Sequence, residues 1–375
     1  MTRSEGRIAL ADLRALDRAH GTLLRAAVDR VAASGRFVLG EEVSAFERAL
    51  AARLGAAHAV GVGSGSDALY LALRAAGVQP GDVVITTPLS FIATAEAIVR
   101  AGARPQFVDV DDSLCLSATA VTEYLERCRR SDGALRDPRG APVRALLPVH
   151  LYGRLADVAA LEAVARDAGL ALIHDAAHAF GARLEGHTAC LSFFPGKTLG
   201  AWGDGGAVVT NDDEVARALR SLREHGRTAE HRYETLGLNS RLDAIHAAVL
   251  AAKLPLFDAE EAKRREHAAY YDARLGEYVG TRSLREGEVC SLYTVRVGNR
   301  DALRAHLDAQ GIDTAVYYPT LLCDQAAIDL EDRPDVPRAR LASSEVLTLP
   351  CHAFMDRQAL DRVVDAIISH RIRRG

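Results

Sequence analysis

The rarest basic residue of this chain lies where an amine could do chemistry. Of its 46 basic residues only three are lysines, Lys197, Lys253 and Lys263. Lys197 follows an apolar run in CLSFFPGKTLGAWGDGGAVVT, with five glycines between Gly196 and Gly206. A primary amine that loses its proton easily can form a Schiff base with a carbonyl group, and a guanidinium cannot. Lys197 is therefore either a candidate for carbonyl chemistry or an ordinary loop lysine.

A second candidate site is the run Gly63-Ser64-Gly65-Ser66, between a β-run and a helix expected from about Asp67. The N-terminus of a helix presents free N–H groups and a positive dipole end, and glycines let an anion approach the backbone. The run is neither a Walker loop nor a complete G-x-G-x-x-G fingerprint. It predicts a phosphate site or, equally, a plain turn in which Ser66 caps the helix.

A third candidate, Asp175, ends the apolar run of LALIHDAAHAFGA, and a carboxylate at the end of a parallel strand lies where open α/β sheets bind ligands. A buried aspartate there needs a cationic partner, such as arginine, histidine or a protonated heterocyclic nitrogen; otherwise it caps the next turn. For His174 we expect packing and hydrogen bonding. A phosphate cradle, a carboxylate and a glycine-framed lysine together meet the needs of pyridoxal 5′-phosphate.

Short β-rich runs alternate with helical patterns through the part of the chain that carries these residues. Strands are expected at 57–62, 83–88, 104–110, 143–149, 170–174, 190–194 and 206–210. Helices are expected at 67–76, 93–101, 118–130 and 157–168, and three of them are closed by a glycine. This alternation predicts βαβ units and a largely parallel sheet covered on both faces.

The last third of the chain has a different pattern. Residues 241–275 predict one long helix or two helices joined near Pro255. The elements expected after it are a strand at 292–297, a helix at 300–310, a short strand near 312–317 and a final helix at 356–373. We therefore expect a large domain over residues 1–253, which includes an N-terminal helical segment, and a small domain over residues 254–375.

Two further local expectations concern the surface. Lys253 and Lys263 lie at polar positions of the long helical pattern, and we expect both to face solvent. The segment 129–142 has glycine and proline punctuation and predicts a surface loop.

Composition excludes several classes of protein. The net charge is −4 and no long basic run occurs, so nucleic-acid binding is not expected. No apolar stretch approaches the length of a membrane span, and the N-terminus lacks the apolar core of a signal peptide, so we expect a cytoplasmic protein. The six cysteines are widely spaced and predict free thiols rather than disulfides, and no metal site is expected.

The three candidate segments and several others resemble the DegT/DnrJ/EryC1/StrS family of sugar aminotransferases, within the fold-type I pyridoxal-phosphate enzymes. The matching stretches are GVGSGSDAL, PLSFIATAEAI, FVDVD, PVHLYGR, IHDAAHAFGA, SFFPGKTLGAWGDGGAVVTND and GLNSRLDAIHAAVL. The resemblance extends from about residue 35 to residue 350. It implies an α/β fold with a mostly parallel central sheet flanked by helices in the large domain, and a small C-terminal α/β domain.

The resemblance also implies the cofactor, pyridoxal 5′-phosphate, and roles for individual residues. By position, Lys197 matches the Schiff-base lysine, Asp175 the partner of the pyridine nitrogen, and Phe91 the aromatic residue that stacks on the ring. The phosphate would be bound by residues of three segments: Gly65 and Ser66, Ser192, and Asn239. Because Asn239 matches a residue that reaches the phosphate from the neighbouring subunit, the resemblance implies a homodimer with composite active sites.

Some positions depart from the family pattern. His178 stands where the family usually has Gln, near the ring hydroxyl; an imidazole N–H could donate the same hydrogen bond, with a pH sensitivity that glutamine lacks. The usual His-Tyr-Pro reads Tyr317-Tyr318-Pro319, and the stretch between Ala182 and Ser192 is shorter than usual. Tyr317 and Tyr318 are therefore candidate substrate contacts. Members that dehydrate carry histidine in place of the lysine, so Lys197 argues against dehydration.

The activity implied is transfer of an amino group from an amino acid, most often L-glutamate in the family, to a keto group of a nucleotide-linked keto-(deoxy)sugar. C3 is favoured over C4, in amino-sugar biosynthesis for a natural product or a surface glycan. One alternative is an aminotransferase for a cyclitol ketone or a keto-sugar phosphate. Others are a pyridoxal-phosphate-binding regulatory protein without turnover and a nucleotide-binding oxidoreductase, which the incomplete glycine fingerprint disfavours.

Overall fold

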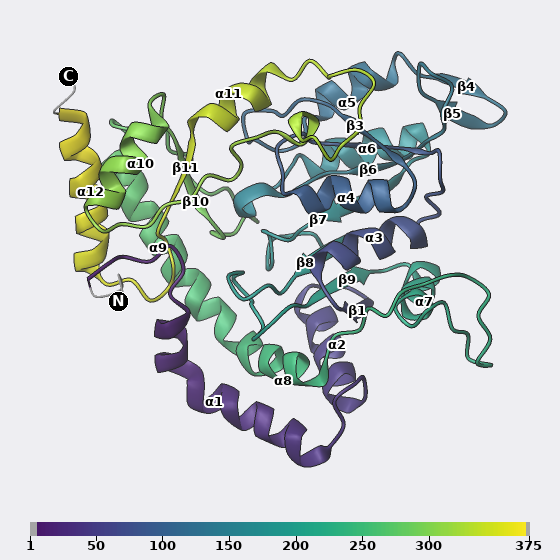
Figure 1. The fold of residues 1–375 in the computed structure, drawn as a ribbon, viewed down its shortest axis with the longest axis horizontal. Helices are drawn as coiled ribbons and strands as arrows, with labels where there is room; N and C mark the ends of the chain where they lie inside the picture. Colours follow the sequence, from purple (N-terminus) through teal and green to yellow (C-terminus); the bar gives the residue numbers. More distant parts are fainter. Residues whose placement is uncertain (1–5, 373–375) are drawn as a thin grey trace.

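A seven-stranded sheet forms the centre of the computed structural model, which describes residues 6–372 (Figure 1). In spatial order the strands are β1 (His58–Val62), β9 (Gly206–Thr210), β8 (Thr188–Ser192), β7 (Ala171–Asp175), β6 (Val143–Leu147), β2 (Val83–Thr86) and β3 (Arg104–Phe107). Neighbours from β8 to β3 pair in parallel, whereas β9 is antiparallel to both β8 and β1. The predicted, mostly parallel sheet is confirmed.

Helices cover this sheet on both faces. They are α3 (Gly65–Ala75), α4 (Ile92–Arg100), α5 (Ala118–Leu125), α6 (Val158–Ala168) and α7 (Asp213–Leu222). Val83 and Ile85 of β2 belong to an apolar cluster that includes residues of α5 and α6, whereas Val84 belongs to one that includes residues of α3 and α7. Because successive side chains of a strand point to opposite faces, the apolar run of β2 is buried from both sides.

The glycine signals mark the helix ends correctly. Gly77, Gly102 and Gly169 follow α3, α4 and α6, each with a positive φ that glycine adopts without steric cost. Pro255 also acts as expected. The long pattern is divided into α8 (Ala244–Lys253) and α9 (Phe257–Leu275), joined by the 3-10 turn η2 (Leu254–Leu256).

A second sheet lies in the C-terminal third. It pairs β10 (Tyr293–Arg296) with β11 (Val346–Leu349) in antiparallel fashion, and it packs with α9, α10 (Arg300–Ala309) and α12 (Arg357–Ile372). The predicted strand near 312–317 is wrong, since this segment makes only single bridges, from Ile312 to Ile8 and from Ala315 to Thr348. The sequence also did not predict β11 or α11 (Pro337–Glu345).

Contacts cross the predicted domain division between residues 253 and 254, which stays a prediction. Ile8, near the N-terminus, packs in the apolar cluster of the second sheet. Ala339 and Ala342 of α11 pack in a cluster of the large sheet. The remaining helices are α1 (Leu13–Ser34) and α2 (Glu41–Arg53), which pack against α8, together with the short 3-10 turns η1 (Leu151–Gly153) and η3 (Leu322–Asp324).

Two local predictions need correction. The segment 129–142 is not only a loop, because β4 (Arg129–Ser131) and β5 (Ala134–Arg136) form a hairpin. Asp132 and Gly133 both have positive φ, as a two-residue hairpin turn of type I′ requires, and the Asp-Gly pair is a strong signal for that turn. The helix predicted to reach residue 130 therefore ends earlier, at Leu125.

The second correction concerns a lysine. Lys263 is exposed as expected, but Lys253 is only 5% exposed and its Nζ donates a hydrogen bond to the carbonyl oxygen of Gly200. Among the described residues, no helix combines the length and the apolar character that crossing a membrane requires.

Candidate active site

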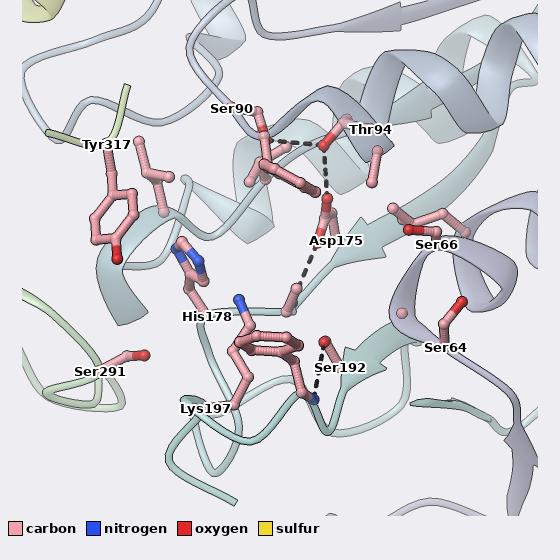
Figure 2. A pocket seen from close by; sticks show the side chains of 18 of the residues that line it. Ser64, Ser66, Ser90, Thr94, Asp175, His178, Ser192, Lys197, Ser291 and Tyr317 are labelled. Carbon is pink, nitrogen blue, oxygen red and sulfur yellow. Dashed lines mark hydrogen bonds between the residues drawn. The ribbon is translucent and has the colours of Figure 1, made fainter. Parts of the chain in front are cut away.

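A cavity of about 460 Å³ lies beyond the C-terminal ends of β7 and β8 (Figure 2). Nine of the residues singled out in the sequence line it: Gly65, Ser66, Phe91, Asp175, His178, Ser192, Lys197, Tyr317 and Tyr318. They come from five separate stretches of the chain, so the fold brings the three candidate segments together. Asn239 does not line this cavity.

The first turn of α3 forms one wall. The helix begins at Gly65, two residues before the predicted start, and Ser64 rather than Ser66 caps it, since the Ser64 hydroxyl accepts a hydrogen bond from Asp67 N at 3.1 Å. Ser66 therefore remains free of the capping role. A Cβ on Gly65 would lie 2.7 Å from the Cβ of Ser192, so only glycine allows this close approach. First-turn amides and the hydroxyls of Ser66 and Ser192 form a donor set suited to a phosphate.

Asp175 lies at the end of β7 and is only 4% exposed. Its Oδ2 accepts a hydrogen bond from Thr94 Oγ1 at 2.8 Å, and its Oδ1 accepts one from Ala177 N at 3.1 Å. Burial raises the pKa of Asp175, against the two hydrogen bonds and the charge of Lys197, which lower it. A protonated heterocyclic nitrogen in the cavity would supply a cationic partner that favours the ionised carboxylate.

Lys197 lies in the loop between β8 and β9 and lines the same cavity as Asp175. Burial lowers the pKa of Lys197 to about 8, and the charge of Asp175 opposes this shift only in part. Within the part of the chain that the structure describes, its amine has no hydrogen-bond or ion-pair partner. At pH 7 roughly a tenth of this amine is therefore unprotonated, far more than for an ordinary lysine, and the unprotonated form is the one that attacks a carbonyl carbon.

His178 faces the cavity beside Lys197 (Figure 2). Its Nδ1 accepts a hydrogen bond from Tyr152 N at 3.4 Å, so in the neutral ring the proton lies on Nε2. Burial, followed by the charge of Lys197, lowers the pKa of His178 well below its usual value. The imidazole is therefore neutral near pH 7, and the pH sensitivity expected from its ordinary pKa is not expected there.

Three aromatic residues line the cavity: Phe91, Tyr317 and Tyr318. Phe91 is 54% exposed, and its ring centroid lies 6.0 Å from that of Tyr318. The ring of Tyr317 lies edge-on to that of His178, with centroids 6.4 Å apart. Tyr152 is buried, and its hydroxyl donates a hydrogen bond to the backbone carbonyl of Tyr317. This bond connects the 3-10 turn after β6 with the segment that carries both tyrosines.

Asn239 is exposed in the segment between α7 and α8, which projects beside α7 in Figure 1. Glu224 and Asn239 form a single antiparallel bridge at the base of this segment. This chain alone therefore places Asn239 outside its own cavity.

Sequence reasoning missed several polar residues of the site. Thr94, Ser90, Asp204 and Ser291 also line the cavity. A signal for Thr94 was available, since it follows Phe91 by three residues at the start of an expected helix, where residues three apart lie on one side. His174 behaves as expected: it is buried, and its Nδ1 lies 2.9 Å from Nε2 of His150.

The residues of the cavity fit pyridoxal 5′-phosphate. The close approach of Gly65 to Ser192 leaves amides and hydroxyls for the phosphate, and Asp175 offers a carboxylate for the pyridine nitrogen. The amine of Lys197 has no partner among the described residues. Within residues 6–372, no group of three or more histidine, cysteine or acidic side chains has an arrangement that could hold a metal ion.

Comparison with known proteins shows the family of this chain. A model of the DegT/DnrJ/EryC1/StrS aminotransferase family matches residues 20–368. The dTDP-3-amino-3,4,6-trideoxy-alpha-D-glucose transaminase of Streptomyces venezuelae is 42% identical over 91% of this chain and 90% of its own. A protein of Geobacillus stearothermophilus named pleiotropic regulatory protein is also 42% identical, over 91% of this chain and 92% of its own.

A solved structure extends the likeness to the whole fold. The crystal structure of S. venezuelae DesV in complex with a ketimine intermediate has a TM-score of 0.90 and 39% sequence identity, and the match covers 97% of this chain and 98% of that one. Fold and site together define a pyridoxal-phosphate-dependent aminotransferase. The chain belongs to the DegT/DnrJ/EryC1/StrS aminotransferase family, and within it to the sugar aminotransferase type.

Proposed function

We propose that this protein transfers an amino group from an amino acid, L-glutamate in the simplest case, to a keto group at C3 of a nucleotide-linked keto-deoxysugar. The observation that carries the proposal is the unpartnered amine of Lys197, with its pKa lowered to about 8, in one cavity with the buried carboxylate of Asp175. The preference for C3 rests on the 3-amino sugar in the name of the S. venezuelae relative. The product would serve a natural product or a surface glycan, and we place the reaction in the cytoplasm.

Bound pyridoxal 5′-phosphate would supply an electron sink for the carbanion formed at the α-carbon of the amino donor. In this proposal Gly65, Ser66 and Ser192 bind the phosphate, and Phe91 covers one face of the ring. Asp175 holds a proton on the pyridine nitrogen, because a carboxylate beside it favours the charged form. The Nε2–H of His178 donates to the ring hydroxyl in place of the usual glutamine amide.

Lys197 has two tasks in the proposed reaction. Its amine holds the cofactor between turnovers, and once the amino donor displaces it, Nζ is free to act as a base. Nζ then removes the proton from the α-carbon of the donor and delivers it to the cofactor carbon that is bonded to the transferred nitrogen. A pKa near 8 suits this task, because a base works best when its pKa is near the working pH.

The proposal includes a homodimer. Asn239 is exposed and lies outside its own cavity, as expected of a residue that completes the phosphate site of a second subunit. Tyr317 and Tyr318 would contact the sugar, since they line the cavity. The test of the composite site is a mixture of Asn239→Ala and Lys197→Ala chains. Mixed dimers should regain part of the activity that both parents lack, and no recovery would contradict a shared site.

Absorbance spectroscopy tests the cofactor chemistry. The protein reconstituted with pyridoxal 5′-phosphate should show a visible band of the lysine-bound cofactor, which glutamate converts to the amine form with release of 2-oxoglutarate. Borohydride reduction followed by peptide mapping should find the cofactor on Lys197. A protein that cannot be reconstituted, or one whose label lies on another residue, would refute the proposal.

The acceptor is tested with paired ketones. With glutamate present, 3-keto and 4-keto nucleotide sugars are offered separately, next to a cyclitol ketone and a keto-sugar phosphate, and 2-oxoglutarate is measured. We expect the 3-keto nucleotide sugar to have the highest kcat/KM. If only the cyclitol ketone is turned over, the proposed acceptor is wrong, but the proposed aminotransferase reaction stands. An intact cofactor set without any half-reaction would favour a regulatory role, which the name of the Geobacillus relative also suggests for that protein.

A further inference from the structure

Two buried hydroxyls stand in series behind the carboxylate of Asp175 (Figure 2). Thr94 Oγ1 donates to Asp175 Oδ2 at 2.8 Å, and Ser90 Oγ lies 2.8 Å from Thr94 Oγ1. Thr94 is 1% exposed and Ser90 is 4% exposed, so neither hydroxyl can replace these bonds with bulk water. The other carboxylate oxygen, Oδ1, accepts from Ala177 N.

The direction of this series follows from counting protons. A threonine hydroxyl has one proton, and here that proton goes to Asp175. The bond between Ser90 and Thr94 must then run from the serine O–H to the threonine oxygen. Consecutive hydrogen bonds polarise one another in a low-dielectric interior. The bond from Ser90 to Thr94 therefore strengthens the bond from Thr94 to Asp175, and both favour a negative charge on Asp175. Protonation of Asp175 would weaken the acceptor that orients both hydroxyls, because a neutral carboxyl oxygen accepts a weaker hydrogen bond than a carboxylate oxygen.

The first turn of α4, which carries Thr94, follows directly on Phe91, another expected contact of the cofactor. α4 begins at Ile92, with Phe91 as its N-cap, and Thr94 lies in its first turn. The N-terminus of a helix is the positive end of its dipole, which favours an anion nearby. The first turn of α4 therefore presents the aromatic ring of Phe91 to the cavity and a hydroxyl donor to the carboxylate of Asp175.

We propose that Thr94, backed by Ser90, is the positioning residue that keeps Asp175 ionised and aimed at the pyridine nitrogen of the cofactor. The two hydroxyls thereby set how firmly the ring nitrogen keeps its proton. The part of this inference that concerns the cofactor rests on the proposed function. The coupling between Thr94 and the charge of Asp175 is a property of the chain alone, so it is tested without cofactor.

Other charged groups act on Asp175 and must stay constant in the test. Burial raises the pKa of Asp175, whereas the bond from Thr94, the bond from Ala177 and the charge of Lys197 lower it. The remaining titratable groups near this carboxylate are His178 and Tyr318 in the same cavity, and Cys190 on β8. Substitution of Thr94 changes none of these directly.

The first experiment uses the cofactor-free protein and the variant Thr94→Val, which has the same shape without the hydroxyl. Because the folded-state pKa of Asp175 is raised above the unfolded value, ionisation of this group costs stability as the pH rises through the folded pKa. Loss of the Thr94 donor increases that cost only where Asp175 is ionised. We expect the ratio of unfolding constants, variant to wild type, to be roughly tenfold larger at pH 7 than at pH 4.

A matched control is available on β2. Thr86 is also fully buried, and its hydroxyl donates to a backbone carbonyl, that of Leu147, at 2.7 Å. The variant Thr86→Val should be destabilised by the same factor at both pH values, because it removes a neutral bond. Thr94→Ser keeps the hydroxyl and should restore most of the pH dependence of the wild type.

The second experiment uses the reconstituted enzyme. In Thr94→Val the pH at which the cofactor band changes form should shift relative to the wild type, and kcat should fall roughly tenfold to hundredfold with a smaller change in KM for glutamate. Ser90→Ala should shift the band in the same direction by less. An equal stability penalty of Thr94→Val at pH 4 and pH 7 would overturn the inference even if the enzyme binds cofactor. Conversely, failed reconstitution of the wild type would refute the proposed function and leave the first result intact.

Discussion

Lys197, in the loop between β8 and β9, and Lys253, at the end of α8, are two enclosed lysines that differ in what surrounds the amine. Burial lowers the pKa of each to about 8. The Nζ of Lys253 donates to the carbonyl of Gly200, three residues after Lys197, and Glu260 lies close enough to favour its charge. Lys197 instead faces an open cavity, with no hydrogen-bond partner for its amine among residues 6–372.

The difference separates two uses of a buried lysine. A lowered pKa reports that the charged form has lost water, and both residues meet that condition. Reactivity requires in addition a lone pair that no backbone group engages and space for a second molecule. Lys253 holds the loop that carries Lys197, whereas Lys197 offers its amine to a ligand. Each of the following predictions tests this division.

The largest expected effect is on turnover. Lys197→Ala and Lys197→Arg should each lower kcat by at least about a thousandfold, because neither side chain can bind the cofactor covalently and act as the base. Lys253→Arg keeps the positive charge and should retain turnover within a few-fold. Steady-state assays with a 3-keto nucleotide sugar measure both. Comparable losses in Lys253→Arg and Lys197→Arg would remove the distinction.

An effect of intermediate size is expected on stability. In the cofactor-free protein at pH 7, Lys197→Met should raise the free energy of unfolding by about 1 kcal/mol, since it removes an enclosed charge with no hydrogen-bond partner. Lys253→Met should lower it by about 1–2 kcal/mol, because the carbonyl of Gly200 loses its donor. Urea titration measures both, with exposed Lys263→Met as the control that changes nothing.

The pH dependence of stability gives a second readout of the same pair. A lysine with a folded pKa of about 8 and an unfolded value of 10.5 binds fewer protons when folded, so stability rises with pH between these values. In each methionine variant the increase in the free energy of unfolding with pH should be smaller than in the wild type. An unchanged increase would show that the substituted lysine does not cause it.

The smallest effect is expected on His178. Burial is the main reason that the pKa of His178 is low, and the charge of Lys197 lowers it further. In Lys197→Met the pKa of His178 should therefore rise slightly while staying below its ordinary value. Lys253→Met should leave it unchanged. NMR titration of the imidazole in cofactor-free protein resolves the two variants.

Local patterns predict much of this fold and of the site. Glycines after helices, Pro255 in the long helical pattern and the alternation of strands with helices all act over a few residues, and each is found where expected. Lys197 could be selected because it is one of three lysines and lies in a glycine-rich segment, and Asp175 because it ends an apolar strand where open α/β sheets bind ligands. The resemblance to the family then added Phe91 and Ser192, which line the same cavity as Lys197 and Asp175.

Other features depend on contacts that no local pattern contains. Lys253 is buried because its Nζ meets the carbonyl oxygen of Gly200, 53 residues away in the chain, and the local sequence contains no sign of this contact. Thr94 and Asp175 are 81 residues apart in the chain, and only the neighbouring positions of α4 and β7 in the fold bring them together. Ile8, from the other end of the chain, bridges Ile312 and packs in the apolar cluster of the second sheet.

The reversal of β9 has a consequence for engineering. Ser192 at the end of β8 and Gly206 at the start of β9 are directly paired across the sheet, so residues 193–205, including Lys197, form a hairpin connection. Both ends of this connection are held by the same ladder of hydrogen bonds. We expect that the whole segment can be exchanged with that of a relative as one cassette, without a change in the register of the sheet.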